Sequence, residues 1–329
     1  MNLPVAFLAL LIDRLLPPFA GLTRRLGHPV IWQGALISFL EKRLNRPSGS
    51  PMGRRMAGIV MLFVLVLVTG IVCALLSLQL RRLPAGWVLE AVLASIFLAH
   101  KSLEDAVARV ADALDVSEGK NGTIAAARQA VSMIVGRDTG ALDRHETARA
   151  AIESLAENAS DGIIAPLFWL VLFGLPGIGV YKAINTADSM VGHLNARYRD
   201  FGWASARLDD LVNLVPSRLT ALLFSLAALF LAGANPTDSW RTARKDASAH
   251  LSPNAGWPEA ALAGALGFSL GGPRAYQGQV HDLAPMGNGR RDLEAGDIRL
   301  ALKLFGRMTA LALGATGLLT LIWWTFFQA

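Results

Sequence analysis

The stretch MAGIVMLFVLVLVTGIVCALLSLQL, residues 56–80, decides the fold of this chain. It contains no charged residue and no proline. A helix rises about 1.5 Å per residue, so this run is long enough to cross the ~30 Å hydrocarbon core of a bilayer. We therefore expect one uninterrupted membrane-spanning helix here.

Further apolar blocks extend the same argument along the chain. The predicted spans are 3–20, 56–80, 84–100, 163–184, 217–234 and 304–327. Gly174, Pro176 and Gly177 interrupt the 163–184 block, so a bent helix and a re-entrant hairpin both fit. The sequence thus predicts an all-α polytopic membrane protein, with residues 1–329 forming a single integral membrane domain.

Composition and charge agree with this class. Hydrophobic residues make up 53% of the chain and mean hydropathy is +0.41, both high for a soluble enzyme. Basic loops on the cytoplasmic side explain the net charge of +6 better than nucleic acid does, so no nucleic-acid partner is expected. Because Cys73 is the single cysteine, no disulfide framework forms within one chain. The basic residues beside the 56–80 block are Lys42, Arg43, Arg46, Arg54 and Arg55.

Amphipathic helices are predicted between the spans, on the cytoplasmic side. Leu103, Val107, Val110 and Leu114 recur at helical spacing, which indicates one buried face. Asp143 and Glu146 form a plausible capping pair for a second helix that runs to about Asn158.

Chemistry-bearing residues are crowded into a few segments beside the apolar blocks. The first is ARAAIESLAENASDGIIAP, residues 148–166, in which Glu153, Glu157 and Asp161 are spaced by four. On a continuous helix they share one face and repel each other unless a cation neutralises them. Mg²⁺ fits because it prefers carboxylate oxygen and can bridge to phosphate. The alternative is a solvated acidic face, with Arg149 as the partner of Glu153.

The second segment is YKAINTADSMVGHLNARY, residues 181–198. Lys182, Asn185 and Asp188 share a helical face by their spacing, and His193 follows. Polar groups at a membrane boundary are costly to desolvate, so we expect them to be paired or functional. A lone histidine is more often structural than catalytic.

The third segment is SARLDDLVNLVPSR, residues 205–218, in which Arg207, Asp210 and Asn213 lie three apart. Asp209 and Asp210 are candidates for a metal site. For Arg207 and Asp210 taken alone, a plain salt bridge is the simpler reading.

Two loops complete the polar set. Arg137 and Asp138 lie in a glycine-containing turn that suits phosphate but is not a Walker A loop, and a purely structural turn fits equally well. His250, Asn254 and Glu259 lie in a loop rich in Pro, Asn and Gly, where they line a site or satisfy the loop backbone.

In these phrases the chain resembles the CobD/CbiB family, the adenosylcobinamide-phosphate synthases. The matching phrases are HPVIW from His28 with Gly34, KSLE from Lys101, IVGRDT from Ile134, ESLAENASDGIIAPLFW from Glu153, YKAINTADSMVGH from Tyr181, RLDDLVNLVPSRL from Arg207, HLSPNAGWPEAALAGALG from His250, and LGG with Tyr276. They occur in order and cover most of the chain. Together they are far more specific than any one motif.

The resemblance implies an amide-forming ligase of the cytoplasmic (inner) membrane, with its active site facing the cytoplasm. Its substrates would be adenosylcobyric acid and (R)-1-aminopropan-2-ol phosphate, with ATP and Mg²⁺ as cofactors. ATP also follows from chemistry, because a carboxylate and an ammonium do not condense in water without activation. An acyl phosphate and an acyl adenylate both meet that need. The bilayer is an expected partner, and a homo-oligomer is a further expectation.

The hypotheses for individual residues form three groups. Catalytic roles are assigned to Lys182, Asp188, His193 and His250. Nucleotide and substrate binding is assigned to Lys101, Glu104, Arg137, Asp138, Asn158, Asn185, Arg207, Asp210 and Asn254. Mg²⁺ binding is assigned to Glu153, Glu157 and Asp161. We also expect the three polar segments to share one chamber.

Three other classes are kept as alternatives. An intramembrane Mg²⁺-dependent prenyltransferase would need two separated carboxylate clusters, which this chain imitates only loosely. A transporter would be expected to carry paired inverted repeats, and none is evident. An AmpE-like sensory protein would not need the intact polar phrases.

Overall fold

The structure is a computed structural model that describes residues 2–16, 27–117, 123–276, 279–281 and 283–327. The chain forms two compact units, each discontinuous in sequence. Unit 1 comprises Met1–Ala99, Ala165–Asn213 and Ala315–Ala329, and unit 2 comprises His100–Ile164 and Leu214–Gly314. The sequence predicts one membrane domain, whereas the contacts divide it in two.

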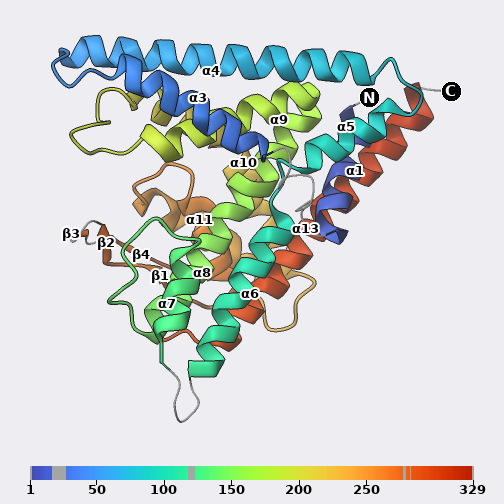
Figure 1. Ribbon diagram of the computed structural model, residues 1–329. Helices are drawn as coiled ribbons and strands as arrows, with labels where there is room; N and C mark the ends of the chain where they lie inside the picture. The colour runs from blue at the N-terminus through green and yellow to red at the C-terminus, as the bar shows by residue number, and fades with distance from the viewer. Residues whose placement is uncertain (1, 17–26, 118–122, 277–278, 282, 328–329) are drawn as a thin grey trace. The chain divides into compact units, whose positions relative to one another are not determined.

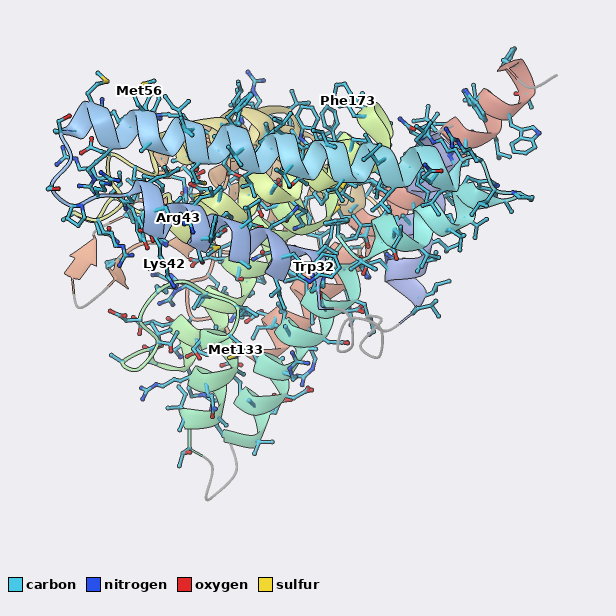
Figure 2. All side chains as sticks on the ribbon, turned by 45° about the horizontal axis from the view of Figure 1, so that its top comes forward. Trp32, Lys42, Arg43, Met56, Met133 and Phe173 are labelled. Carbon is cyan, nitrogen blue, oxygen red and sulfur yellow. The ribbon has the colours of Figure 1, made fainter. Side chains whose placement is uncertain are left out.

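The helices of unit 1 are α1 (Asn2–Leu15), α3 (Pro29–Leu44), α4 (Pro51–Leu80), α5 (Gly86–Ser95) and α9 (Ala165–Val191), with the first part of α10 (Trp203–Ala228) and the end of α13 (Ala295–Phe327) (Figure 1). Ser50 caps α4 by accepting from the Gly53 N–H, and Pro51 occupies the first turn. The uninterrupted helix predicted over residues 56–80 is confirmed as part of α4. Large apolar side chains such as Trp32, Met56 and Phe173 are exposed (Figure 2).

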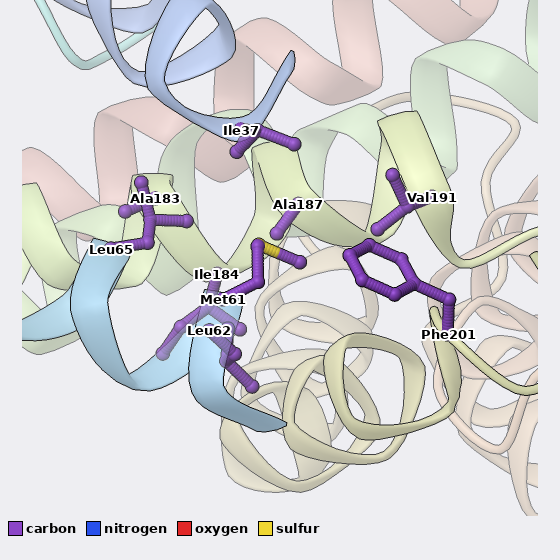
Figure 3. Close-up of a cluster of buried hydrophobic side chains, with 9 residues drawn as sticks. All are labelled: Ile37, Met61, Leu62, Leu65, Ala183, Ile184, Ala187, Val191 and Phe201. Atoms are coloured by element: carbon purple, nitrogen blue, oxygen red, sulfur yellow. The ribbon is translucent and has the colours of Figure 1, made fainter. Parts of the chain in front are cut away.

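A buried hydrophobic cluster joins α3, α4 and α9 (Figure 3). Ala183 and Ala187 of α9 lie in this cluster with Met61 of α4, and their small side chains let the helices approach closely. A Cβ at Gly58 would lie 1.8 Å from the Phe201 carbonyl oxygen, so only glycine fits there. The rest of the cluster is Ile37, Leu62, Leu65, Ile184, Val191 and Phe201.

The chain reverses direction within α9. Gly174 has φ of 67° and is not helical, so it separates two helical segments. A Cβ at Gly177 would lie 2.2 Å from the Trp169 carbonyl oxygen, a contact that a straight helix does not allow. Trp169 Nε1 donates to the Val212 carbonyl, and Tyr181 donates to the neighbouring Asn213. The block thus consists of two helical segments joined by a sharp bend at Gly174, and its re-entry into the membrane stays a prediction.

Unit 2 contains α6 (His100–Ser117), α7 (Ala125–Ser132), α8 (Arg144–Ala159), the π turn η1 (Ser160–Ile164), α11 (Pro236–Asp246), η2 (Ala247–Ala249) and α12 (Gly256–Leu266), with the rest of α10 and the first part of α13. The predicted buried face of α6 is confirmed, because its four apolar residues are all buried. The capping pair of α8 is also confirmed: Asp143 and Glu146 each accept the other's backbone N–H.

Short strands in unit 2 were not predicted. β1 (Leu270–Gly271) pairs antiparallel with β4 (Pro285–Met286), and β2 (Arg274–Tyr276) with β3 (Gln279–His281). Gly271 and Gly272 both have positive φ and turn the chain between β1 and β2. Strands of two or three residues are too short to produce a periodic pattern in the sequence.

Within the described residues, five helical runs are long and apolar enough to cross a membrane: Pro51–Leu80, Gly86–Ser117, Arg144–Val191, Trp203–Ala228 and Ala295–Phe326. They overlap five of the six predicted spans. For the sixth, predicted over residues 3–20, α1 ends at Leu15, and residues 17–20 lie outside the described part. The fold is therefore the all-α polytopic membrane fold that the sequence predicts.

Candidate functional site

Asp209 is the centre of a polar cluster in unit 1, where α9 meets α10. Its Oδ1 accepts from Asn185 Nδ2 at 3.3 Å and its Oδ2 from Asn213 Nδ2 at 3.0 Å. The Tyr181 hydroxyl donates to Asn213 Oδ1 at 3.0 Å. Two helices thus bring amide, phenol and carboxylate groups together, and they join the second and third polar segments.

Two further carboxylates lie within electrostatic range of Asp209. Asp188 and Asp210 each interact unfavourably with it. Asp188 is packed so closely that a Cβ at Gly192 would lie 1.9 Å from its Oδ1. Like charges held together in this way favour a bound cation or a shared proton. In the part of the chain that the structure describes, no three His, Cys, Asp or Glu side chains converge tightly enough to be recognised as a metal site.

The other predicted groups of unit 1 lie around this cluster. Arg207 pairs with Asp210 at 3.6 Å and is largely exposed, which is the salt bridge that its spacing suggests. Lys182 is half-buried, and its charge acts on His28. His193 is exposed, with its ring tilted against Tyr198 at 6.4 Å.

His28, the first residue of the HPVIW phrase, caps α3. Its Nδ1 accepts from the Val30 N–H at 3.2 Å, so in the neutral ring Nε2 carries the proton and donates to the Ile96 carbonyl at 3.0 Å. Burial lowers the pKa of His28 below its usual value. The Ile96 hydrogen bond opposes this shift of the pKa, and repulsion from Lys182 adds to it.

Glu153 occupies a different environment, in unit 2. Its Oε2 accepts from Arg137 Nη2 at 2.5 Å, and its Oε1 from the Gly271 N–H at 2.6 Å. The side chain is 5% exposed, so it does not belong to a solvated acidic face. Its ion-pair partner is Arg137 and not Arg149, the partner suggested by helical spacing. The role of Glu153 as a Mg²⁺ ligand stays a prediction.

Glu157 and Asp161 do not continue a face with Glu153. Glu157 is exposed at the end of α8, whereas Asp161 is half-buried. Asp161 lies in the π turn, whose spacing differs from that of an α-helix. The even spacing of four in the sequence therefore does not become a stacked row.

The remaining predicted residues of unit 2 make mostly local contacts. Lys101 pairs with Glu104 at 3.1 Å and with Asp105 at 2.8 Å. Asn158 donates to the Ser154 carbonyl at 2.9 Å. Asp138 follows Arg137 in the loop before α8.

The loop from His250 is tied to α10 and α12. Asn254 Oδ1 accepts from Arg218 at 2.8 Å, and that guanidinium lies over the Trp257 ring. His250 Nδ1 accepts from the Ser252 N–H at 3.0 Å, and Nε2 lies 3.6 Å from the fully buried Glu259. Both ring nitrogens therefore face protein groups.

The contacts of two basic residues, Arg218 and Arg291, cannot be predicted from the sequence. Arg218 is the last residue of the third polar segment, but its contacts with Asn254 and Trp257 depend on a loop far away in the sequence. Arg291 lies in a polar loop, and its packing against Gly271 cannot be read from spacing. Asp209 has a weak signal, because Asn213 follows it by four and the two side chains therefore share one helical face.

Comparison with known proteins identifies the family. The model of the family described as CobD/Cbib protein matches residues 6–305. "Cobalamin biosynthesis protein CobD" of Rhodobacter capsulatus is 47% identical over 306 residues, 92% of each chain. The protein of the same name from Brucella melitensis is 47% identical over 325 residues, 95% of each chain. That of Sinorhizobium fredii is 45% identical over 326 residues, 96% of each chain.

No solved structure matches the chain. The family match covers every polar segment described above, and the curated relatives match over nearly their whole length. The resemblance noted in the sequence is confirmed: the chain belongs to the CobD/CbiB family, whose curated members are cobalamin biosynthesis proteins.

Proposed function

We propose that this protein acts in cobalamin biosynthesis by joining adenosylcobyric acid to (R)-1-aminopropan-2-ol phosphate through an amide bond, at the expense of ATP. The observation that carries the proposal is the polar cluster around Asp209, which lies inside the residues matched by the family. Family membership also favours this ligase over a prenyltransferase, a transporter or an AmpE-like sensory protein.

The proposed reaction has two steps. First, a propionate oxygen of the corrinoid attacks a phosphorus atom of ATP, and ADP or pyrophosphate leaves. Then the amine of aminopropanol phosphate attacks the acyl carbon, and phosphate or AMP leaves with the former carboxylate oxygen. The attacking ammonium must lose a proton before it is nucleophilic. Holding both partners in one site removes much of the entropic barrier.

The oxygen-rich cluster fits a divalent ion by its donor chemistry. Asp188, Asp209 and Asp210 supply carboxylate oxygens and Asn185 a carbonyl oxygen, which are the groups that Mg²⁺ prefers. When bound, Mg²⁺ would offset charge on the transferring phosphate. Glu157 and Asp161 remain the alternative set, and the variants in the Discussion separate the two.

Proton transfer and substrate orientation are proposed for the basic groups around the cluster. His193 is exposed and electrostatically coupled to Asp188, so it suits proton removal from the ammonium better than the enclosed His250. Lys182 is proposed to orient the corrinoid carboxylate. Because ATP is cytoplasmic, we propose that the protein lies in the cytoplasmic membrane with this cluster open to the cytoplasm.

The test is a turnover assay on the purified full-length chain in detergent. Adenosylcobyric acid, aminopropanol phosphate and Mg-ATP are supplied together, and adenosylcobinamide phosphate is identified by mass spectrometry. Omission of each component in turn, and ADP or AMP analysis, provide the controls. A folded protein that gives no product with all components present would contradict the proposal.

A further inference from the structure

A circuit of hydrogen bonds, closed by the backbone of α8, links this helix to the glycine turn after β1, all within unit 2. Glu153 Oε1 accepts from the Gly271 N–H at 2.6 Å. The Gly271 carbonyl then accepts from Arg291 Nη2 at 2.9 Å. The Arg291 carbonyl accepts from Arg149 Nη1 at 2.8 Å. Arg149 and Glu153 are one helical turn apart on α8, which closes the circuit.

The glycines make this arrangement sterically possible. Gly271 and Gly272 have φ of 74° and 86°, a region that other residues rarely adopt. A Cβ at Gly272 would lie 2.2 Å from Arg291 Nη2. The turn therefore holds the Arg291 guanidinium directly against the backbone.

The circuit holds two guanidinium groups, Arg149 and Arg291, and one carboxylate, Glu153. Glu153 is 5% exposed and is already paired with Arg137. Arg149 is 11% exposed; its ion-pair partner among the described residues is the more exposed Glu146, at 3.9 Å, and Glu153 and Asp143 also attract it. Arg291 has no carboxylate within 4.0 Å in the described ranges, and it repels Arg149. Two other carboxylates of unit 2, Asp246 and Asp297, contact the Gly287 N–H and Arg290 respectively.

Two guanidinium groups held on one backbone turn suit an anionic ligand. An anion that contacts both also offsets the repulsion between Arg291 and the nearly buried Arg149. Arg149 and Arg291 each donate one hydrogen bond to a backbone carbonyl of the circuit. An arginine side chain has five N–H donors. Paired guanidinium groups match the tetrahedral oxygens of a phosphate.

We propose that Arg149 and Arg291 bind the phosphate group of a phosphorylated substrate. Glu153 and Arg137 are positioning residues, because their ion pair holds the Gly271 N–H and thereby the turn that carries Arg291. This proposal rests on the proposed function for the identity of the ligand, since both ATP and aminopropanol phosphate carry phosphate. The sequence suggests Arg137 as the phosphate-binding residue, whereas this proposal assigns phosphate binding to Arg149 and Arg291.

The test is isothermal titration calorimetry on the full chain in detergent. The probes are aminopropanol phosphate, ATP, and 1-aminopropan-2-ol without its phosphate. We expect Arg149→Gln and Arg291→Gln each to weaken binding of at least one phosphorylated probe by about tenfold or more, as loss of a charged hydrogen bond should. The probe that loses affinity identifies the substrate. Arg149→Lys should retain part of the affinity, because it keeps the charge.

Arg299→Gln is the matched control. Arg299 is also a helical arginine of unit 2, but it pairs with Asp112 at 2.9 Å and Asp115 at 2.5 Å. It should leave all three affinities unchanged. If Arg149→Gln does not fold, Arg291→Gln decides, because it lies in a loop outside the helices.

The proposal is overturned if both phosphorylated probes bind the folded Gln variants as tightly as they bind the parent protein. It is also overturned if Arg299→Gln weakens them equally, since the effect would then be one of general charge. Failure of the proposed function is a separate result. If the protein forms no amide but its phosphate binding depends on Arg149 and Arg291, the proposed function fails and the phosphate site stands. If the protein forms the amide and its phosphate binding does not depend on these arginines, the proposed function stands and the phosphate site fails.

Discussion

Asn213 donates to the carboxylate of Asp209 at 3.0 Å, one turn along the same helix. With Asn185 bound to the other oxygen, Asp209 is fixed between α9 and α10. A carboxylate held by two amides is preorganised, so it needs little rearrangement to act on a ligand.

Asp209→Asn should therefore lower turnover by about a hundredfold, roughly the 3 kcal/mol of one lost transition-state contact. The change keeps the shape of the side chain and removes its charge. The measurement is the rate of amide formation at saturating Mg²⁺ and ATP, with the melting temperature as a check on folding. Asp238→Asn is the matched control, because Asp238 is an exposed aspartate of unit 2 that pairs with Arg241. A near-normal rate for Asp209→Asn would move the site elsewhere.

The two candidate groups of Mg²⁺ ligands predict opposite results when the Mg²⁺ dependence of the rate is measured. If the ion lies in unit 1, Asp188→Asn should raise the Mg²⁺ concentration needed for half-maximal rate at least tenfold, whereas Glu157→Gln and Asp161→Asn should not. If the acidic segment of α8 holds the ion, the order reverses. Equal Mg²⁺ dependence in all three variants would exclude both assignments.

Glu153→Gln should act mainly on stability. Removing one member of a buried ion pair typically costs about 3–5 kcal/mol, because the other charge is left uncompensated. Arg137 is 10% exposed and would be that charge. We expect a clearly lower melting temperature in detergent for Glu153→Gln than for Glu157→Gln, whose side chain is exposed. A double variant, Arg137→Met with Glu153→Leu, should recover much of the loss.

The sequence predicts helices and spans well because their signals are local. Charge-free runs such as residues 56–80 and the capping pair Asp143–Glu146 determine the structure over a few turns. The sequence does not determine the bend at Gly174, since glycine and proline permit a change of direction without requiring it.

The site is less predictable because its contacts are distant in sequence. Spacing correctly placed Arg207 beside Asp210. It gave Arg149 as the partner of Glu153, but the loop residue Arg137 reaches that carboxylate. The chamber shared by all three polar segments stays a prediction, since the Glu153 segment belongs to unit 2 and the other two lie in unit 1.

His28 should make stability depend on pH. Its pKa is lowered in the folded protein, so between that value and the unfolded value of about 6.5 the unfolded state binds more protons. Stability from this residue is therefore complete above about pH 6.5 and decreases as the pH falls below it. His28→Asn keeps a capping acceptor and cannot titrate. Denaturation of both proteins from pH 8 to about pH 5 should show a stability difference that changes with pH, and parallel curves would contradict this assignment.

The crossing of the bilayer by α4 can be tested with the chain's own cysteine content. Cys73 is the single cysteine, so a Cys73→Ser background allows one new cysteine at a time. Val68 is exposed at the centre of α4, where hydrocarbon should surround it, whereas Ser50 lies at the capped end. A cysteine at Val68 should react with a membrane-impermeant maleimide far more slowly than one at Ser50, because thiolate forms poorly in hydrocarbon. Dissolving the membrane in SDS should equalise the two rates. Fast aqueous labelling at Val68 in intact vesicles would place α4 at a water-filled surface and remove the central span of the fold.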